Sequence, residues 1–184
     1  MKFNKTELPD VYILEPSIFV DKRGYFFESF NLNKFEKKIY PIKFIQDNES
    51  KSSKGVLRGL HFQKPPFDQA KLLRCIQGEV LDIALDIRKK SKTYGKHISV
   101  LLSDKNKRQL FIPRGFAHGF FVLSDTATFA YKVDNIYAPD YDAGIRWNDK
   151  DLNIKWGVQD KEVIISEKDS QLPFFSELES PFTT

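Results

Sequence analysis

Short apolar and β-branched runs, separated by turn residues, are the feature that most constrains the fold of this 184-residue chain. The runs are roughly four to nine residues long, and such a spacing of strands and turns is typical of an all-β sandwich or barrel. The predicted strands are 11–14, 24–31, 55–63, 71–76, 79–87, 96–102, 109–112, 119–123 and 126–134. We therefore expect a sheet-based domain in which helices are minor elements.

The segment 79–87 shows the strand pattern most clearly, because its side chains alternate between two faces. One face is apolar and the other carries carboxylates: Leu81, Ile83, Leu85 and Ile87 lie on the first, and Val80, Asp82, Ala84 and Asp86 lie on the second. A solvated outer face explains Asp82 and Asp86, but a barrel with a polar binding cavity inside gives the same pattern. The residues alone leave both explanations open.

Residues 32–39 form the one convincing helical stretch. Apolar side chains recur there three and four residues apart, after a potential cap at Asn31. After Asp169, the prolines Pro173 and Pro181 interrupt regular hydrogen bonding and predict an extended or looped tail.

The composition supports a single folded domain. Hydrophobic residues make up 41% of the chain and charged residues 29%, which supports one core and excludes a largely disordered chain. No low-complexity linker divides the sequence, so we expect one domain over residues 1–184. No apolar run reaches the length of a membrane span and the first residues lack a signal peptide's apolar stretch, which predicts a cytoplasmic protein without a membrane partner. The one cysteine, Cys75, lies among apolar residues and is expected to be a buried strand thiol.

The positive charge of the chain is small and scattered. Lys and Arg number 29 against 25 Asp and Glu, a formal net charge of +4. The basic clusters at 34–38, 88–92 and 105–108 are short and lie among polar or turn residues. Since no single element gathers the charge, we expect solvated loops and no nucleic-acid partner, although a small anionic ligand is compatible with this distribution.

An Arg-Gly pair precedes two of the three histidines, in the segments 58–61 (RGLH) and 114–118 (RGFAH). One histidine of this kind more often has a structural role, but two in matched surroundings point to a shared site. Neither segment contains a His-x-His pair, and His97 lies in a different predicted strand. The number of ligands falls short of a catalytic metal site, so we expect no metal.

Seven segments, which follow one another from about residue 19 to residue 169, resemble the dTDP-4-dehydrorhamnose 3,5-epimerase family. They read FVDKRGYFFESFN, QDNESKSSKGVLRGLHFQ, QAKLLRCIQGEVLDIALDIR, SKTYGKHISVLLSDKNKRQLFIPRGFAHGFFVL, YKVDNIYAP, GIRWNDKDLNIKW and ISEKD. The resemblance implies a cupin-type jelly-roll barrel with short peripheral helices, which forms a homodimer. It covers most of the chain, and an ordered set of segments is more specific than any single motif.

The resemblance also implies an isomerase that inverts C3 and C5 of a nucleotide-linked 4-keto-6-deoxyhexose without a metal or redox cofactor. The implied reaction converts dTDP-4-dehydro-6-deoxyglucose into dTDP-4-dehydrorhamnose. One alternative is a single-carbon epimerase of a related dTDP-, GDP- or CDP-linked ketosugar. Others are a cupin that binds a nucleotide sugar without turning it over and a metal-dependent cupin oxygenase or isomerase.

The implied reaction needs two proton-transfer groups. The 4-keto group acidifies the neighbouring C–H bonds, and inversion returns a proton to the opposite face. By resemblance, His61 is the base and Asp169 is the carboxylate that orients it. Tyr131 matches the proton donor on the far face, and Lys71 matches the group that stabilises negative charge on the C4 oxygen. A protein that only binds the sugar has no need of two proton-transfer groups.

Further residues match substrate-binding positions of the family: Arg23, Glu28, Gln46, Asn48, Arg58, His118, Asp142 and Lys168. A guanidinium fork suits the phosphate oxygens of a diphosphate, which favours such a role for Arg23 and Arg58. Tyr137 is added because it lies close to Tyr131 in sequence. Three positions depart from the family pattern and leave the substrate open: Phe62 replaces tyrosine, Ala70 replaces glycine and Asp142 replaces glutamate.

Overall fold

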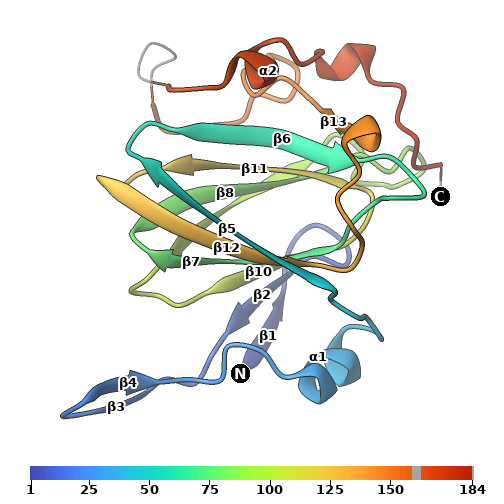
Figure 1. Ribbon diagram of the computed structural model, residues 1–184. Coiled ribbons are helices and arrows are strands. Elements are labelled where there is room, and N and C mark those ends of the chain that lie inside the picture. Colours follow the sequence, from blue (N-terminus) through green and yellow to red (C-terminus); the bar gives the residue numbers. More distant parts are fainter. Residues whose placement is uncertain (159–162, 184) are drawn as a thin grey trace.

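The computed structural model describes residues 1–158 and 163–183 and contains two antiparallel sheets that face each other (Figure 1). The six-stranded sheet has the order β1 (Lys2–Lys5), β2 (Tyr12–Glu15), β10 (Gln109–Ile112), β7 (Lys71–Gln77), β12 (Thr126–Val133) and β5 (Gln46–Ser53). The five-stranded sheet has the order β13 (Asp142–Gly144), β6 (Leu57–Gln63), β11 (Phe116–Val122), β8 (Glu79–Asp86) and β9 (His97–Ser103). The all-β prediction is confirmed.

Short elements lie outside the two sheets: the hairpin of β3 (Phe19–Asp21) and β4 (Gly24–Phe26), the helices α1 (Leu32–Lys38) and α2 (Glu167–Ser170), and the 3₁₀ turns η1 (Pro139–Tyr141) and η3 (Phe175–Glu177). The hairpin stands away from the body of the molecule (Figure 1). Helix α1 confirms the predicted helical stretch, and the Asn31 side chain accepts the Lys34 backbone N–H at 3.1 Å as its cap. None of the helices in residues 1–158 and 163–183 has the length and apolar content needed to cross a membrane.

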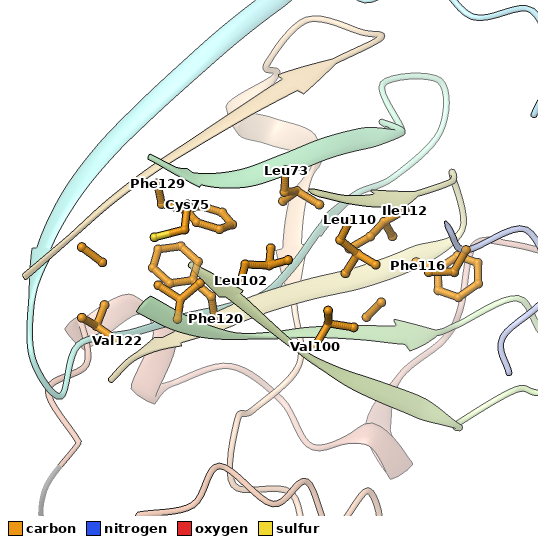
Figure 2. Close-up of a cluster of buried hydrophobic side chains, with 14 of the residues drawn as sticks. Leu73, Cys75, Val100, Leu102, Leu110, Ile112, Phe116, Phe120, Val122 and Phe129 are labelled. Carbon is orange, nitrogen blue, oxygen red and sulfur yellow. The ribbon is translucent and has the colours of Figure 1, made fainter. Parts of the chain in front are cut away.

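One apolar cluster fills part of the space between the sheets (Figure 2). Its side chains come from the inner faces of β7 to β12 and include Leu73, Leu102, Phe120 and Phe129. Cys75 lies in the same cluster and is buried, as expected for a strand thiol. The outer faces of both sheets are covered as well, because each packs against a further segment of the chain. The C-terminal segment covers the five-stranded sheet, and the segment with α1 covers the six-stranded sheet.

The side chains of β8 alternate as predicted, but both of its faces are buried. Val80 and Ala84 enter the inner cluster, whereas Ile83 and Leu85 face outward and pack in the cluster that contains Trp156 of the C-terminal segment. The fully apolar face of β8 is therefore its outer face. The face that mixes apolar residues with carboxylates is its inner face.

Asp82 and Asp86 lie on this inner face, and both are fully buried. Asp86 accepts hydrogen bonds from Arg88, Ser91 and Thr93, which follow the end of β8. The solvated outer face is thus the wrong explanation for these carboxylates, and the barrel interior is the right one.

Several strand limits differ from the predictions. The strand expected at 24–31 ends at Phe26, because the chain then turns toward α1, where Phe30 packs on Phe35 with ring centroids 5.8 Å apart. The strand expected at 119–123 already begins at Phe116. The sequence analysis did not predict β1, β3, β5 or β13. Strand β5 reads QDNESKSS and pairs with β12 along its whole length, so its polar side chains are not evidence of a loop.

Candidate active site

A cavity of about 490 Å³ lies between the two sheets, a size typical of small-molecule sites. Its wall brings together the four predicted catalytic residues and two predicted binding residues: His61, Lys71, Tyr131, Asp169, Arg58 and His118. These side chains come from β6, β7, β11, β12 and α2, so both sheets contribute to the wall. The barrel thereby gathers residues that are far apart in the sequence.

His61 and Asp169 form a hydrogen-bonded pair, with 2.8 Å between Nε2 of His61 and Oδ1 of Asp169. The backbone N–H of Gly59 donates to the other carboxylate oxygen at 3.1 Å, and Ser166 Oγ accepts the Asp169 backbone N–H as the N-cap of α2. Burial alone would raise the pKa of Asp169, but the hydrogen bonds from His61 and Gly59 outweigh it and hold the pKa below its ordinary value. Asp169 is therefore ionised, and it orients His61 with a proton on Nε2 and a free lone pair on Nδ1.

Two glycines allow β6 and β11 to approach closely beside this pair. Gly59 has φ +124°, and a Cβ built on it would lie 2.5 Å from the Cα of Gly119. A Cβ on Gly119 would lie 2.8 Å from the carbonyl oxygen of Arg58. The same two strands pair His61 directly with His118, so the close approach places both histidines on the cavity wall.

Lys71 and Tyr131 lie on the opposite sheet, on β7 and β12. Burial lowers the pKa of Lys71 to about 8, although the negative charge of Asp142 opposes the shift. Burial raises the pKa of Tyr131, against the positive charge of Arg58, which lowers it. At neutral pH, Lys71 is thus still mostly cationic, while Tyr131 keeps its phenolic proton.

Polar side chains on the inner face of β5 extend the site. Arg58 donates to Ser52 Oγ from Nε and Nη2, both at 3.2 Å, and this fixes the guanidinium group at the cavity wall. Gln46 donates to the side-chain oxygen of Asn48 at 2.8 Å. Asn48 is the pairing partner of Tyr131 on β12, and Tyr131 lines the main cavity.

A cluster of three predicted binding residues lies at the edge of β6. Asp142 begins β13, whose Gly144 is the pairing partner of His61. Lys168 Nζ donates to Asp142 Oδ2 at 2.6 Å, and the Tyr137 hydroxyl donates to the same oxygen at 3.2 Å. The hydrogen bond to Asp142 raises the pKa of Lys168.

Arg23 and Glu28 are the two predicted site residues that the structure does not bring to this region. Arg23 lies at the turn of the β3–β4 hairpin and binds Asp21 at 2.6 Å, with its side chain 84% exposed. Glu28 accepts hydrogen bonds from Lys34 and Asn31 beside α1. Neither side chain is among those that line the cavity of its own chain.

Sequence reasoning missed three residues that support the site. Ser52 holds Arg58, Ser166 caps the helix that carries Asp169, and Asp82 binds His118 with 3.0 Å between Oδ2 and Nε2. The capping pattern of Ser166 was a readable signal, because serine three residues before an acidic residue favours a helix start. Among residues 1–158 and 163–183, no group of three or more His, Cys, Asp or Glu side chains is arranged to hold a metal ion.

Comparisons with known proteins show the family of the chain. Residues 5–177 match the family model described as dTDP-4-dehydrorhamnose 3,5-epimerase. The chain is 56% identical over 170 residues to the dTDP-4-dehydrorhamnose 3,5-epimerase of Shigella flexneri, which covers 92% of this chain and 93% of the relative.

Two solved structures are similar over nearly the whole chain. The crystal structure of dTDP-4-dehydrorhamnose 3,5-epimerase from Elizabethkingia anophelis has a TM-score of 0.92 and 50% identity, and covers 96% of this chain and 97% of that one. The dTDP-6-deoxy-D-glucose-3,5-epimerase from Legionella pneumophila, in complex with dTDP-4-keto-L-rhamnose, has a TM-score of 0.94 and 42% identity, and covers 99% and 96%. These similarities confirm the expected cupin-type jelly-roll barrel. The chain belongs to the dTDP-4-dehydrorhamnose 3,5-epimerase family.

Proposed function

We propose that this chain inverts C3 and C5 of dTDP-4-dehydro-6-deoxyglucose to give dTDP-4-dehydrorhamnose, with His61 as the base and Tyr131 as the acid. The reaction class follows from the family. The observation that carries the assignment of roles is the placement of the two groups. His61 lies on the five-stranded sheet and Tyr131 on the six-stranded sheet, and both line one cavity. A hexose between them meets a base from one sheet and an acid from the other.

Proton removal begins at the lone pair on Nδ1 of His61. The C4 carbonyl makes the C–H bonds at C3 and C5 acidic, and the abstracted proton turns the imidazole into an imidazolium that Asp169 stabilises through Nε2–H. The electron pair moves onto the C4 oxygen. The cationic Lys71 stabilises this enolate, a contribution of about 3 kcal/mol in comparable oxyanion sites.

Tyr131 completes the inversion by donating its phenolic proton to the opposite face of the carbon. The new C–H bond forms as the enolate collapses to the ketone. The His61 imidazolium then releases the abstracted proton to solvent, and the Tyr131 phenolate takes one up. These steps move only protons, so the proposal includes no redox cofactor and no metal. Arg58 binds the diphosphate, while Gln46, Asn48 and the cluster of Tyr137, Asp142 and Lys168 bind the rest of the dTDP-sugar.

The substrate and the number of inverted carbons are tested by incubation with dTDP-4-dehydro-6-deoxyglucose in deuterated water. Deuterium at both C3 and C5 supports the double epimerase. Deuterium at one carbon indicates a single-carbon epimerase. Exchange only with a GDP- or CDP-linked ketosugar would assign a different nucleotide to the substrate. Binding without exchange of any of these sugars would leave only the binding-protein alternative.

The roles of the two groups are tested by His61→Ala and Tyr131→Phe. His61→Ala removes the base and should abolish exchange. Tyr131→Phe leaves the base in place, so it should spare deuterium exchange more than product formation. His97→Gln is the matched control, because His97 lies on β9 and is not among the residues lining the cavity. Full activity of both site variants would refute these roles.

We further propose that the chain forms a homodimer. Apolar side chains on the β3–β4 hairpin are exposed to solvent, with Phe19 65%, Val20 78% and Phe26 70% exposed. Exposed apolar patches of this kind mark interaction sites. A second copy that accepts the hairpin would cover these residues, and would bring Arg23 from the hairpin turn to the site of its partner.

A further inference from the structure

The barrel contains a second pair of histidine and aspartate beside the first. His118 lies directly opposite His61 on the neighbouring strand, and both histidines use Nε2 to bind a carboxylate. The distance from Nε2 of His118 to Oδ2 of Asp82 is 3.0 Å. His118 lines the cavity, and its Nδ1 makes no hydrogen bond to a residue that the structure describes. Both pairs therefore present the Nδ1 side of an imidazole to the substrate space.

The two carboxylates differ in how many donors surround them. Asp169 accepts hydrogen bonds from His61 and from the backbone N–H of Gly59, one on each oxygen. Asp82 is fully buried, and its Oδ1 has no hydrogen-bond partner within residues 1–158 and 163–183. An ionised carboxylate without donors is costly to bury, whereas a neutral carboxylic acid is much less so.

The elements packed around Asp82 supply few charges. Its pairing partner on β9 is Val100 and its partner on β11 is Phe120, both apolar. The titratable groups that face it are His118 on β11 and Lys71 on β7 of the opposite sheet. Burial raises the pKa of Asp82 against both of these groups, and burial also lowers the pKa of His118. Each shift favours a neutral acid next to a neutral imidazole.

We propose that Asp82 is a positioning residue that remains a neutral carboxylic acid and donates its proton to Nε2 of His118, which fixes the tautomer of His118 with the hydrogen on Nδ1. The two pairs then have opposite polarity. His61 presents a lone pair to the cavity and accepts a proton, while His118 presents an N–H and only donates a hydrogen bond. This role rests on the proposed function. His118 is then a neutral hydrogen-bond donor to the sugar nucleotide, and it does not compete with His61 as a base.

The tautomers are directly observable, because the chain has only three histidines. Protein labelled with ¹⁵N-histidine is examined by two-dimensional ¹⁵N–¹H NMR near pH 7, and the signals are assigned with His61→Gln and His97→Gln. The expected result is an Nε2–H tautomer for His61 and an Nδ1–H tautomer for His118. An Nε2–H tautomer or an imidazolium at His118 would overturn the proposal. This readout needs no variant of Asp82 and no turnover.

A matched pair of variants tests the same point through activity. In Asp82→Asn the side-chain amide can still donate to Nε2 of His118, so the tautomer should persist and kcat should fall by less than about tenfold. In Asp169→Asn no carboxylate accepts the Nε2–H of His61, and a comparable change in a histidine–aspartate pair lowers kcat about 10⁴-fold. If Asp82→Asn and Asp169→Asn both keep the native near-UV circular dichroism and lose kcat equally, the proposal is contradicted. A lack of exchange in the unmodified chain would instead refute the proposed function and leave the tautomer assignment standing.

Discussion

In the proposed function, burial of the single side chain of Lys71 sets a pH limit on the reaction. Its pKa of about 8 means that the amine is a cation below that pH and neutral above it. Because the enolate needs the cation, we expect kcat to fall as pH rises through about 8. The pKa of Tyr131 is raised above its ordinary value, so the phenol does not titrate in this window. The measurement is the pH dependence of kcat. Lys71→Gln should lower kcat about 10²-fold or more and remove the decline near pH 8.

The same titration of Lys71 changes the free energy of unfolding in the opposite direction to kcat. The folded-state pKa of Lys71 lies below the unfolded value of about 10.4, so the folded protein binds fewer protons between about pH 8 and 10. The contribution of Lys71 to the free energy of unfolding therefore rises with pH in the same window in which kcat falls. Partial exposure of Lys71 to the cavity lessens this effect. A decline of kcat that persists in Lys71→Gln would assign the limit to another group.

In the proposed function, Ser52 acts on the substrate through Arg58. Its hydroxyl accepts two hydrogen bonds from the guanidinium group, and hydrogen bonds to charged groups contribute roughly 1.5–3 kcal/mol. We expect Ser52→Ala to raise KM for the dTDP-sugar about three- to tenfold with little change in kcat, because the reacting carbons do not contact Arg58 in the proposed mode. Ser53→Ala is the matched control, since Ser53 is the next residue of β5 and is exposed. A loss confined to kcat would contradict the role.

Among the strands, β6 and β11 approach each other so closely that their contact has no room for an added methyl group. Gly119→Ala puts a methyl group 2.8 Å from the carbonyl oxygen of Arg58, and the strands must separate to accept it. We expect a loss of about 1–3 kcal/mol in the free energy of unfolding, as for other overpacked sites, together with lower activity, because the histidines lie on these strands. Urea unfolding measures the change. Gly157→Ala is the control. Alanine is strained at φ +78°, but no described atom lies within 4 Å of a Cβ added to Gly157, so this variant has backbone strain without a steric clash.

At the level of elements, the sequence predicted strands that contain apolar or β-branched residues and missed the all-polar strand β5. Strands β7, β8, β10 and β12 follow the predictions closely, because their inward residues fill the core. Strand β5 was missed because its residues, QDNESKSS, are all polar, although the strand pairs with β12 along its whole length. Asp169 looks like a surface residue in the sequence, yet it is buried, because the C-terminal segment carries it across the five-stranded sheet to His61.

Across the whole molecule, the resemblance selected four residues that share one cavity, which no local pattern did. It named His61, Lys71, Tyr131 and Asp169, which come together only when the two sheets close. The departure at Phe62 leaves the cavity unchanged, because Phe62 faces outward and packs near Phe182. Residue patterns could not reveal the role of Asp82, since its burial depends on neighbouring strands that are distant in sequence.

The exposed hairpin leads to a prediction about two chains together. If Arg23 serves the site of its partner, each dimer site uses His61 from one chain and Arg23 from the other. Arg23→Ala and His61→Ala homodimers should then both be impaired. When the two variants are unfolded, mixed in equal amounts and refolded, half of the dimers carry one site with both native residues, so about one quarter of the sites should regain activity. The measurement is the deuterium exchange rate of the mixture. If the rate equals the sum of the two separate variants, Arg23 does not cross between chains, and the apolar hairpin must be covered in another way.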